Sequence, residues 1–163
     1  MGGAQISSVD GLESIYWNPS GLSFSKSDAN ALFSYRSYIA DMSLDYAALS
    51  GRFGGLGTFG LSFRALNIGS INVTTLNQPD GTGATMTPTY FVIGLTYSKR
   101  LTDRISVGVT FNIINESFDR VTATGSSFDI GVQYRDLFEV EGLALGVVVK
   151  NLGGSMTFGG NAL

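Results

Sequence analysis

Few side chains in this chain could carry out catalysis or hold a metal ion. Its 163 residues include no histidine and no cysteine. Their absence removes Ser-His-Asp and Cys-His catalysis, Cys/His zinc sites, histidine-ligated haem and disulfide bonds. We therefore expect a protein that is not an enzyme and that has no cofactor and no metal. A hydrolase is the weakest alternative, because such enzymes usually need a histidine base.

Two glycine-containing segments could suggest ion or phosphate binding. Residues 77–83 lack the alternating Asp/Asn ligands and the closing glutamate of a calcium loop. The glycines between residues 51 and 57 are not followed by the Lys-Ser/Thr pair and the helix of a phosphate loop. We interpret the first segment as an external loop and the second as a tight hairpin turn. The net charge of -3 also argues against a nucleic-acid partner.

Alternation of apolar and polar residues runs through most of the chain and predicts antiparallel β-strands. No helical pattern of useful length competes with it. Most of these strands are close to the length of about 9–11 residues that crosses a bilayer when tilted. The predicted strands are 30–39, 42–53, 57–68, 90–100, 105–117, 127–135 and 143–150.

One face of the last five strands is apolar along the central part of each strand. Aromatic residues such as Tyr35, Tyr97 and Tyr134 lie near the ends of the apolar rows, as they do in the girdles of membrane barrels. We predict that this face contacts lipid. The lipid-facing candidates are Phe59, Leu61, Phe63, Ile93, Leu95, Val107, Val109, Phe111, Ile130, Val132, Leu145 and Val147.

The opposite face consists mostly of glycine, serine and threonine. A soluble β-sandwich usually places charged residues on its wet face, whereas small residues suit a narrow or plugged lumen. The charged candidates could form an ion-pair network that selects what passes, but we favour pairing that only satisfies buried charges. The lumen-lining candidates are Arg36, Asp45, Ser62, Arg64, Thr96, Asn112, Glu116, Asp129 and Gln133.

Together these patterns predict an all-β fold, an antiparallel transmembrane β-barrel in a bacterial outer membrane. Tight turns at 54–55 and 102–104 fall on one side of the sheet, and longer loops at 70–88 and 119–126 fall on the other, as in outer-membrane barrels. The alternative is a soluble β-sandwich with its apolar face inside, acting as a binding or adhesion module.

The predicted strands do not suffice for a complete barrel. Bacterial single-chain barrels have an even number of strands, and open edges would leave unpaired backbone groups in lipid at a cost of several kcal/mol each. We therefore expect residues 29–163 to form an incomplete barrel, with the missing strands beyond Leu163.

Residues 1–28 precede the first strand and contain Trp17-Asn18-Pro19-Ser20-Gly21. Asparagine favours an Asx turn, proline fixes φ and glycine tolerates positive φ, so this is a turn signature. It could be an ordinary turn that leads into a strand. It could instead belong to a small hatch inside the barrel mouth, with apolar anchors at Ile15, Tyr16, Trp17 and Leu22.

A series of short motifs runs through nearly the whole chain. They are MGGA at 1–4, IYWNPSGL at 15–22, YSKRLTDR at 97–104, SFDIG at 127–131 and VKNLG at 149–153. In this order they resemble the PorV/PorQ family of bacterial outer-membrane β-barrel proteins, which are related to FadL-type transporters. Ser20 stands where the family usually has alanine. MGGA lies inside the chains of that family, so the resemblance implies that Met1 is an internal methionine or a truncation point.

The resemblance implies a barrel of roughly 14 strands, and a hatch motif formed by Trp17, Asn18, Pro19 and Gly21. It also implies one of two roles, with outer-membrane lipid as a partner in both. One role is passage of an apolar, fatty-acid-like ligand. The other is support of type IX secretion, with secretion-system components or exported cargo as partners. The sequence does not choose between them.

Overall fold

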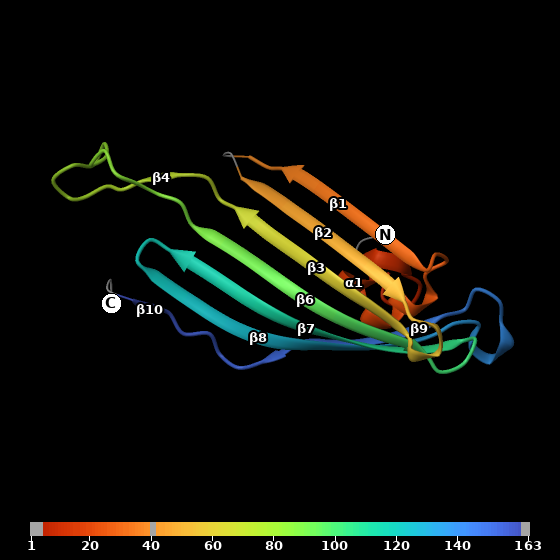
Figure 1. The fold of residues 1–163 in the computed structure, drawn as a ribbon. Helices are drawn as coiled ribbons and strands as arrows, with labels where there is room; N and C mark the ends of the chain where they lie inside the picture. Colours follow the sequence, from red (N-terminus) through yellow and green to blue (C-terminus); the bar gives the residue numbers. More distant parts are fainter. Residues whose placement is uncertain (1–4, 40–41, 161–163) are drawn as a thin grey trace.

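The computed structural model describes residues 5–39 and 42–160, and the MGGA motif lies outside these ranges. The described chain forms one large antiparallel sheet, one small hairpin and an N-terminal segment of short helices (Figure 1). Successive long strands pair with one another, as expected for antiparallel strands joined by short connections. The predicted all-β, antiparallel class is confirmed.

A strand is present at each of the predicted positions. The strands are β1 (Ala29–Ser37), β2 (Ser43–Arg52), β3 (Thr58–Asn67), β6 (Thr89–Arg100), β7 (Ile105–Phe118), β8 (Val121–Tyr134) and β9 (Leu145–Gly153). The short strand β10 (Gly159–Gly160) pairs with the beginning of β8, beyond the stretch of β8 that pairs with β9. β9 and β10 therefore lie along the same edge of β8.

The connection between β7 and β8 differs from the prediction. The sequence predicts a long loop over 119–126, but β8 already begins at Val121. Residues 121–124 are mostly β-branched, which favours a strand, and they pair with the end of β7. Asp119, with φ 53°, adopts the left-handed conformation that tight hairpin turns require. The long loop predicted here is therefore wrong.

The remaining connections follow the prediction more closely. The turn at 53–57 contains η3 (Gly54–Leu56), and residues 101–104 form another short turn at the same end of the sheet. The connection between β8 and β9 at that end contains η4 (Leu137–Glu139). At the opposite end, the long connection between β3 and β6 projects beyond the sheet and carries the hairpin β4 (Ile71–Asn72) and β5 (Thr85–Met86) (Figure 1).

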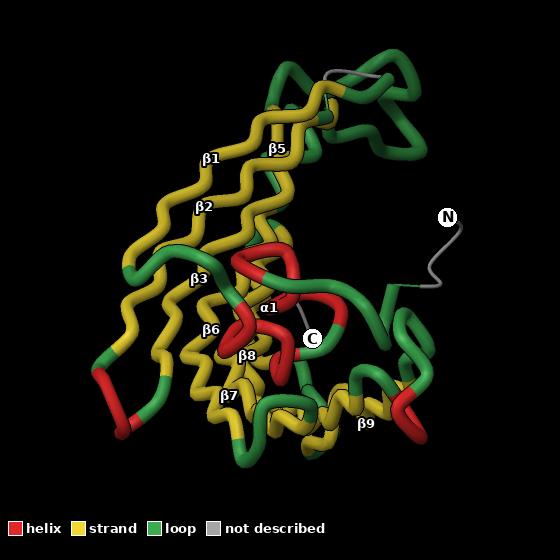
Figure 2. The backbone as a smooth tube through the Cα atoms, turned by 90° about the vertical axis from the view of Figure 1, so that its right-hand side faces the viewer, coloured by secondary structure: helices red, strands yellow, loops and turns green. Residues whose placement is uncertain are grey.

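Residues 5–28, called here the N-terminal segment, pack against one face of the sheet. They contain η1 (Gly11–Glu13), α1 (Ser14–Trp17) and η2 (Pro19–Phe24). Figure 2 shows them within the hollow of the curved sheet. Pro19 occupies the first position of η2, where its fixed φ suits the helix and its missing N–H is not needed. Across the described residues, no helix combines the length and apolar character needed to span a membrane.

The two faces of the sheet have opposite environments. We call the face toward the N-terminal segment the inner face and the other the outer face. Thr96, Ser98 and Thr110 on the inner face are completely buried, although most side chains of this face are small and polar. The outer face is apolar, yet no described part of the chain forms a second layer over it (Figures 1 and 2).

Strand register places all the predicted lipid-facing residues on this outer face. Most of their side chains are exposed, including Leu95 and Val147 at 57% each. Val107, Val109 and Phe111 are half-buried between neighbouring strands. Aromatic pairs also lie on the outer face, such as Phe59 with Tyr97, whose ring centroids are 5.1 Å apart.

One predicted lumen residue, Asp45, lies on the outer face. It pairs with Ala65, in register with the outer-face residues Ala47 and Phe63. Its carboxylate accepts a hydrogen bond from the Asn67 side-chain amide at 3.0 Å. The prediction is wrong because both faces of β2 carry apolar residues. Its inner face packs against the N-terminal segment, so polarity does not distinguish the two faces of this strand.

The sheet is not closed into a barrel. Within residues 5–39 and 42–160, β1 pairs only with β2, while β9 and β10 pair only with β8. Both outermost strands therefore present a row of unpaired backbone groups. The structure is a curved, open, antiparallel sheet whose hollow holds the N-terminal segment (Figure 2).

Candidate functional site

Glycines on the inner face let the backbone of the N-terminal segment approach the sheet closely. A Cβ atom on Gly108 would overlap the backbone of Pro19 and Ser20. A Cβ atom on Gly131 would overlap the side chain of Asn18. Glycine is the residue that permits such an approach in a strand. The inner face is therefore shaped to fit the turn signature found in the sequence.

Asn18 fastens this turn to the sheet. It is completely buried, and its Oδ1 accepts hydrogen bonds from the Ser20 backbone N–H at 3.2 Å and the Ser20 hydroxyl at 2.7 Å. Its Nδ2 donates to the backbone carbonyls of Ile6 at 2.9 Å and Val132 at 3.1 Å. Asn18 thus forms the predicted Asx turn and also joins it to the beginning of the segment and to β8.

Side chains of β6 and β8 form further polar contacts with the segment. The Ser98 hydroxyl donates to the Ser20 carbonyl at 2.8 Å, and Gln133 Nε2 donates to the carbonyls of Ile6 and Val9 at 3.0 Å each. The Arg135 guanidinium lies over the Phe24 ring, 3.9 Å from its centroid. Burial lowers the pKa of Arg135, while the carboxylates of Asp10 and Asp136 act in the opposite direction.

An apolar cluster packs the segment against β1 and β2. Leu12, Ile15 and Leu22 of the segment are buried there with Ala48 of β2. Ile15 and Leu22 are therefore buried apolar contacts, as the sequence predicts. Tyr16, by contrast, is 46% exposed. Tyr16 instead lines a hollow between the segment and the inner face.

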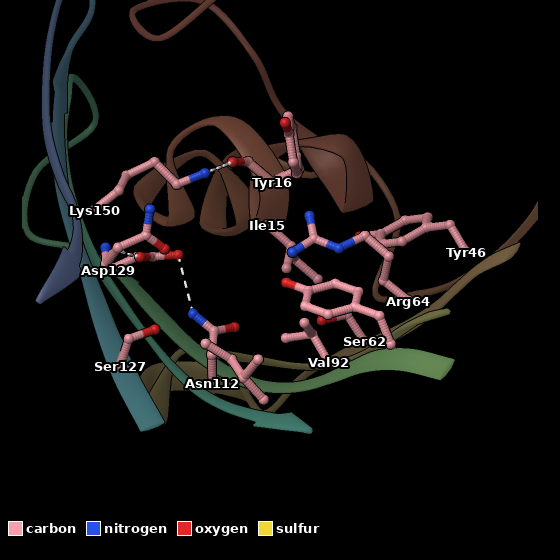
Figure 3. Close-up of a pocket in the computed structure, with 13 residues that line it drawn as sticks. Ile15, Tyr16, Tyr46, Ser62, Arg64, Val92, Asn112, Ser127, Asp129 and Lys150 are labelled. Atoms are coloured by element: carbon pink, nitrogen blue, oxygen red, sulfur yellow. Dashed lines mark hydrogen bonds between the residues drawn. The ribbon is translucent and has the colours of Figure 1, made fainter. Parts of the chain in front are cut away.

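A hollow, called here the chamber, lies between the N-terminal segment and the inner face (Figure 3). Aromatic, polar and charged side chains from several elements surround it. Its lining includes Ile15, Tyr16, Tyr46, Ser62, Arg64, Tyr90, Val92, Asn112, Ile114, Ser127, Asp129, Lys150 and Asn151.

Asp129 forms one wall of the chamber and is only 5% exposed. Its carboxylate accepts hydrogen bonds from Asn112 Nδ2 at 3.1 Å and from the Asn151 backbone N–H at 2.7 Å. The second bond occurs where the pairing of β8 with β9 is irregular, between Phe128 and Ile130. The buried carboxylate is thus stabilised by two donors.

Two cationic side chains in the chamber meet at Tyr16 of the N-terminal segment. The Arg64 guanidinium lies 5.6 Å from the centroid of the Tyr16 ring, and Lys150 Nζ lies 4.5 Å from it. Lys150 Nζ also donates a hydrogen bond to the Tyr16 carbonyl (Figure 3). Tyr16 is therefore the point at which the N-terminal segment contacts the charged part of the inner face.

The structure brings some of the predicted lumen residues together and separates others. Ser62, Arg64, Asn112 and Asp129 line the chamber. Thr96 and Gln133 are buried on the same face, and Gln133 holds the N-terminal segment. Arg36 lines a neighbouring groove at β1 and β2. Glu116 lies on the inner face opposite Tyr90, but outside the chamber.

Tyr46, Ser127 and Lys150 belong to the chamber but were not singled out from the sequence. Ser127 and Lys150 lie in the SFDIG and VKNLG motifs, on either side of the irregular pairing of β8 with β9. Strand alternation places Ser127 on the inner face. The contact between Lys150 and Tyr16 depends on how the N-terminal segment docks, for which the sequence carries no signal.

Replacing Asn18 with alanine should loosen the N-terminal segment. The change leaves the Ser20 N–H and the Ile6 and Val132 carbonyls without this partner, so we expect a loss of about 1–3 kcal/mol in the free energy of unfolding. Urea unfolding in detergent measures this change in the free energy of unfolding. Asn67→Ala, at an exposed asparagine, is the matched control and should change stability by about 0.5 kcal/mol or less. Equal effects of the two substitutions would contradict the role of Asn18.

Comparison with known proteins gives no identification: no family model and no curated protein sequence matches this chain.

Proposed function

We propose that this chain is part of an outer-membrane β-barrel whose N-terminal segment plugs the lumen. The observation that supports it most is the distribution of side chains between the two faces. Leucine, valine, isoleucine and phenylalanine project outward without cover, whereas serine, threonine and glutamine are buried beneath the N-terminal segment. This arrangement suits a sheet with hydrocarbon outside and a polar interior.

The soluble β-sandwich accounts poorly for the same observations. A sandwich buries its apolar face against a second sheet, and no described part of the chain forms such a sheet. Contiguous apolar surface on this scale is uncommon in soluble monomers. The small polar face would be the wet face of a sandwich, yet Thr96 and Gln133 on it are completely inaccessible.

The open edges also support a larger barrel. A strand edge in lipid leaves its N–H and C=O groups without partners, which only closure of the sheet avoids. We propose that further strands pair with the free edges of β1 and of β9. A barrel of the PorV/PorQ type, which the motifs resemble, would provide them.

Within this barrel we propose a role in passage or in secretion support, without catalysis. Passage of an apolar ligand has a specific observation in its favour. A groove beside the chamber runs between the N-terminal segment and the strands β1 and β2. Apolar and aromatic side chains form much of its lining, including Trp17, Leu32, Leu44 and Tyr46. Such a lining suits an apolar ligand better than an extended polar chain.

Fractionation of cells that produce the full-length protein tests the barrel. We expect the protein in the outer-membrane pellet, soluble only with detergent, and migrating differently on SDS gels before and after boiling. A protein that stays in solution without detergent would contradict the proposal. Mass spectrometry of the purified protein then tests the role: a bound lipid-like molecule supports passage, and co-purified secretion components support secretion.

A further inference from the structure

We infer that the chamber binds an oxyanion, a carboxylate or phosphate group, with the Arg64 guanidinium as its principal partner. The inference deepens the proposed function and rests on it, because the chamber is formed by the N-terminal segment inside the sheet. It concerns a ligand group in the chamber, which shares Tyr16, Tyr46 and Arg64 with the groove beside it.

Arg64 is half-buried, and no described residue accepts a hydrogen bond from it or forms an ion pair with it. It lies over the face of the Tyr16 ring, 5.6 Å from the ring centroid. A guanidinium carries five N–H donors in a planar fork that matches the oxygens of carboxylates and phosphates. In Figure 3 the guanidinium of Arg64 points toward the middle of the chamber. The side chain therefore presents donors to a ligand.

Two hydroxyl groups in the same chamber also lack partners. Ser127 is 4% exposed and its Oγ forms no hydrogen bond with any described residue. The buried hydroxyl of Tyr46 has no partner among these residues either. Most buried polar side-chain atoms in proteins are hydrogen-bonded, so unpartnered groups call for an explanation. Figure 3 shows the Ser127 hydroxyl directed into the chamber. An oxygen-rich ligand would accept hydrogen bonds from both hydroxyls.

The charges around the chamber favour an anion. Arg64 and Lys150 contribute two positive charges and Asp129 one negative charge. The Asp129 carboxylate already accepts hydrogen bonds from Asn112 and Asn151. Water could satisfy the hydroxyls, but it would not balance the remaining positive charge. Hydrogen bonds between a charged donor and an oxyanion are about twice as strong as neutral ones.

Equilibrium dialysis of the full-length protein in detergent tests the site. The probes are radiolabelled inorganic phosphate and, separately, acetate, at constant ionic strength set with sodium chloride. We expect saturable binding of one anion per chain. Stronger binding of phosphate points to a phosphorylated ligand, and stronger binding of acetate points to a carboxylate.

Substitutions locate the binding. We expect Arg64→Gln to weaken it about tenfold or more, whereas Arg120→Gln, in the exposed turn after β7, leaves it unchanged. If Arg64→Gln does not fold, Ser127→Ala tests the site in its place. We expect Ser127→Ala to weaken anion binding about fivefold. Its matched control is Ser106→Ala, because the Ser106 hydroxyl is also buried and unpartnered but lies outside the chamber.

The possible failures are distinguishable. A protein that shifts on SDS gels after boiling but binds neither anion overturns the site and leaves the barrel intact. Binding that is unchanged in both Arg64→Gln and Ser127→Ala also overturns it. A protein that never enters the membrane fraction contradicts the barrel instead.

Discussion

Leu95→Arg is expected to destabilise the membrane-inserted protein by about 2–4 kcal/mol, the cost of an arginine near the bilayer midplane on a barrel's lipid face. Leu95 lies in the middle of β6, on the outer face, and is 57% exposed. An exposed leucine in a soluble protein could become arginine at almost no cost. The substitution therefore separates the membrane barrel from the soluble sandwich. Urea unfolding in lipid vesicles measures the difference.

The matched control is Leu76→Arg, in the long connection between β3 and β6. Leu76 is fully exposed, and this connection projects beyond the end of the sheet (Figure 1). We expect this control to change the free energy of unfolding by about 0.5 kcal/mol or less. If Leu95→Arg lowered the free energy of unfolding as little as the control does, the outer face would be facing water.

Gly108→Val should prevent the N-terminal segment from docking. Any Cβ at this position meets the backbone of Pro19 and Ser20, which cannot move aside as a flexible side chain could. We expect a loss of about 3 kcal/mol in the free energy of unfolding, at the upper end of overpacking effects. We also expect faster protease cleavage within residues 5–28, because the segment no longer packs in the hollow.

Gly154→Val is the control for this substitution. Apart from its chain neighbours, no heavy atom of the described residues lies within 4 Å of the position where its Cβ would be, so the added side chain has space. We expect wild-type stability within about 0.5 kcal/mol and wild-type protease resistance. Equal stability and cleavage in the two variants would show that the inner face does not hold the segment closely.

The strands and their faces could be predicted because alternation is a local property. From β3 onward, the middle of each strand has one apolar face and one face of mostly small or polar residues, so the side of each strand could be predicted from the sequence. Two features could not be predicted in this way. Asp45 lies on a strand with apolar residues on both faces, and Val121–Thr124 has too little contrast to distinguish strand from loop.

The site was less predictable because it depends on contacts between distant parts of the chain. The turn at Asn18 was visible, but its fit against Gly131 joins residues more than 100 positions apart. The meeting of Arg64 and Lys150 at Tyr16 likewise needs three elements to come together. No periodicity in the sequence predicts such contacts between distant residues.

Spin labels on single introduced cysteines test the central claim most directly, since the chain has no cysteine of its own. A label at Leu95→Cys, in protein reconstituted into lipid bilayers, measures access to oxygen, which concentrates in hydrocarbon, and to a water-soluble nickel complex. A label at Leu76→Cys provides the aqueous reference. We predict high oxygen and low nickel access at position 95, with the reverse at position 76. High nickel access at position 95 would contradict the account.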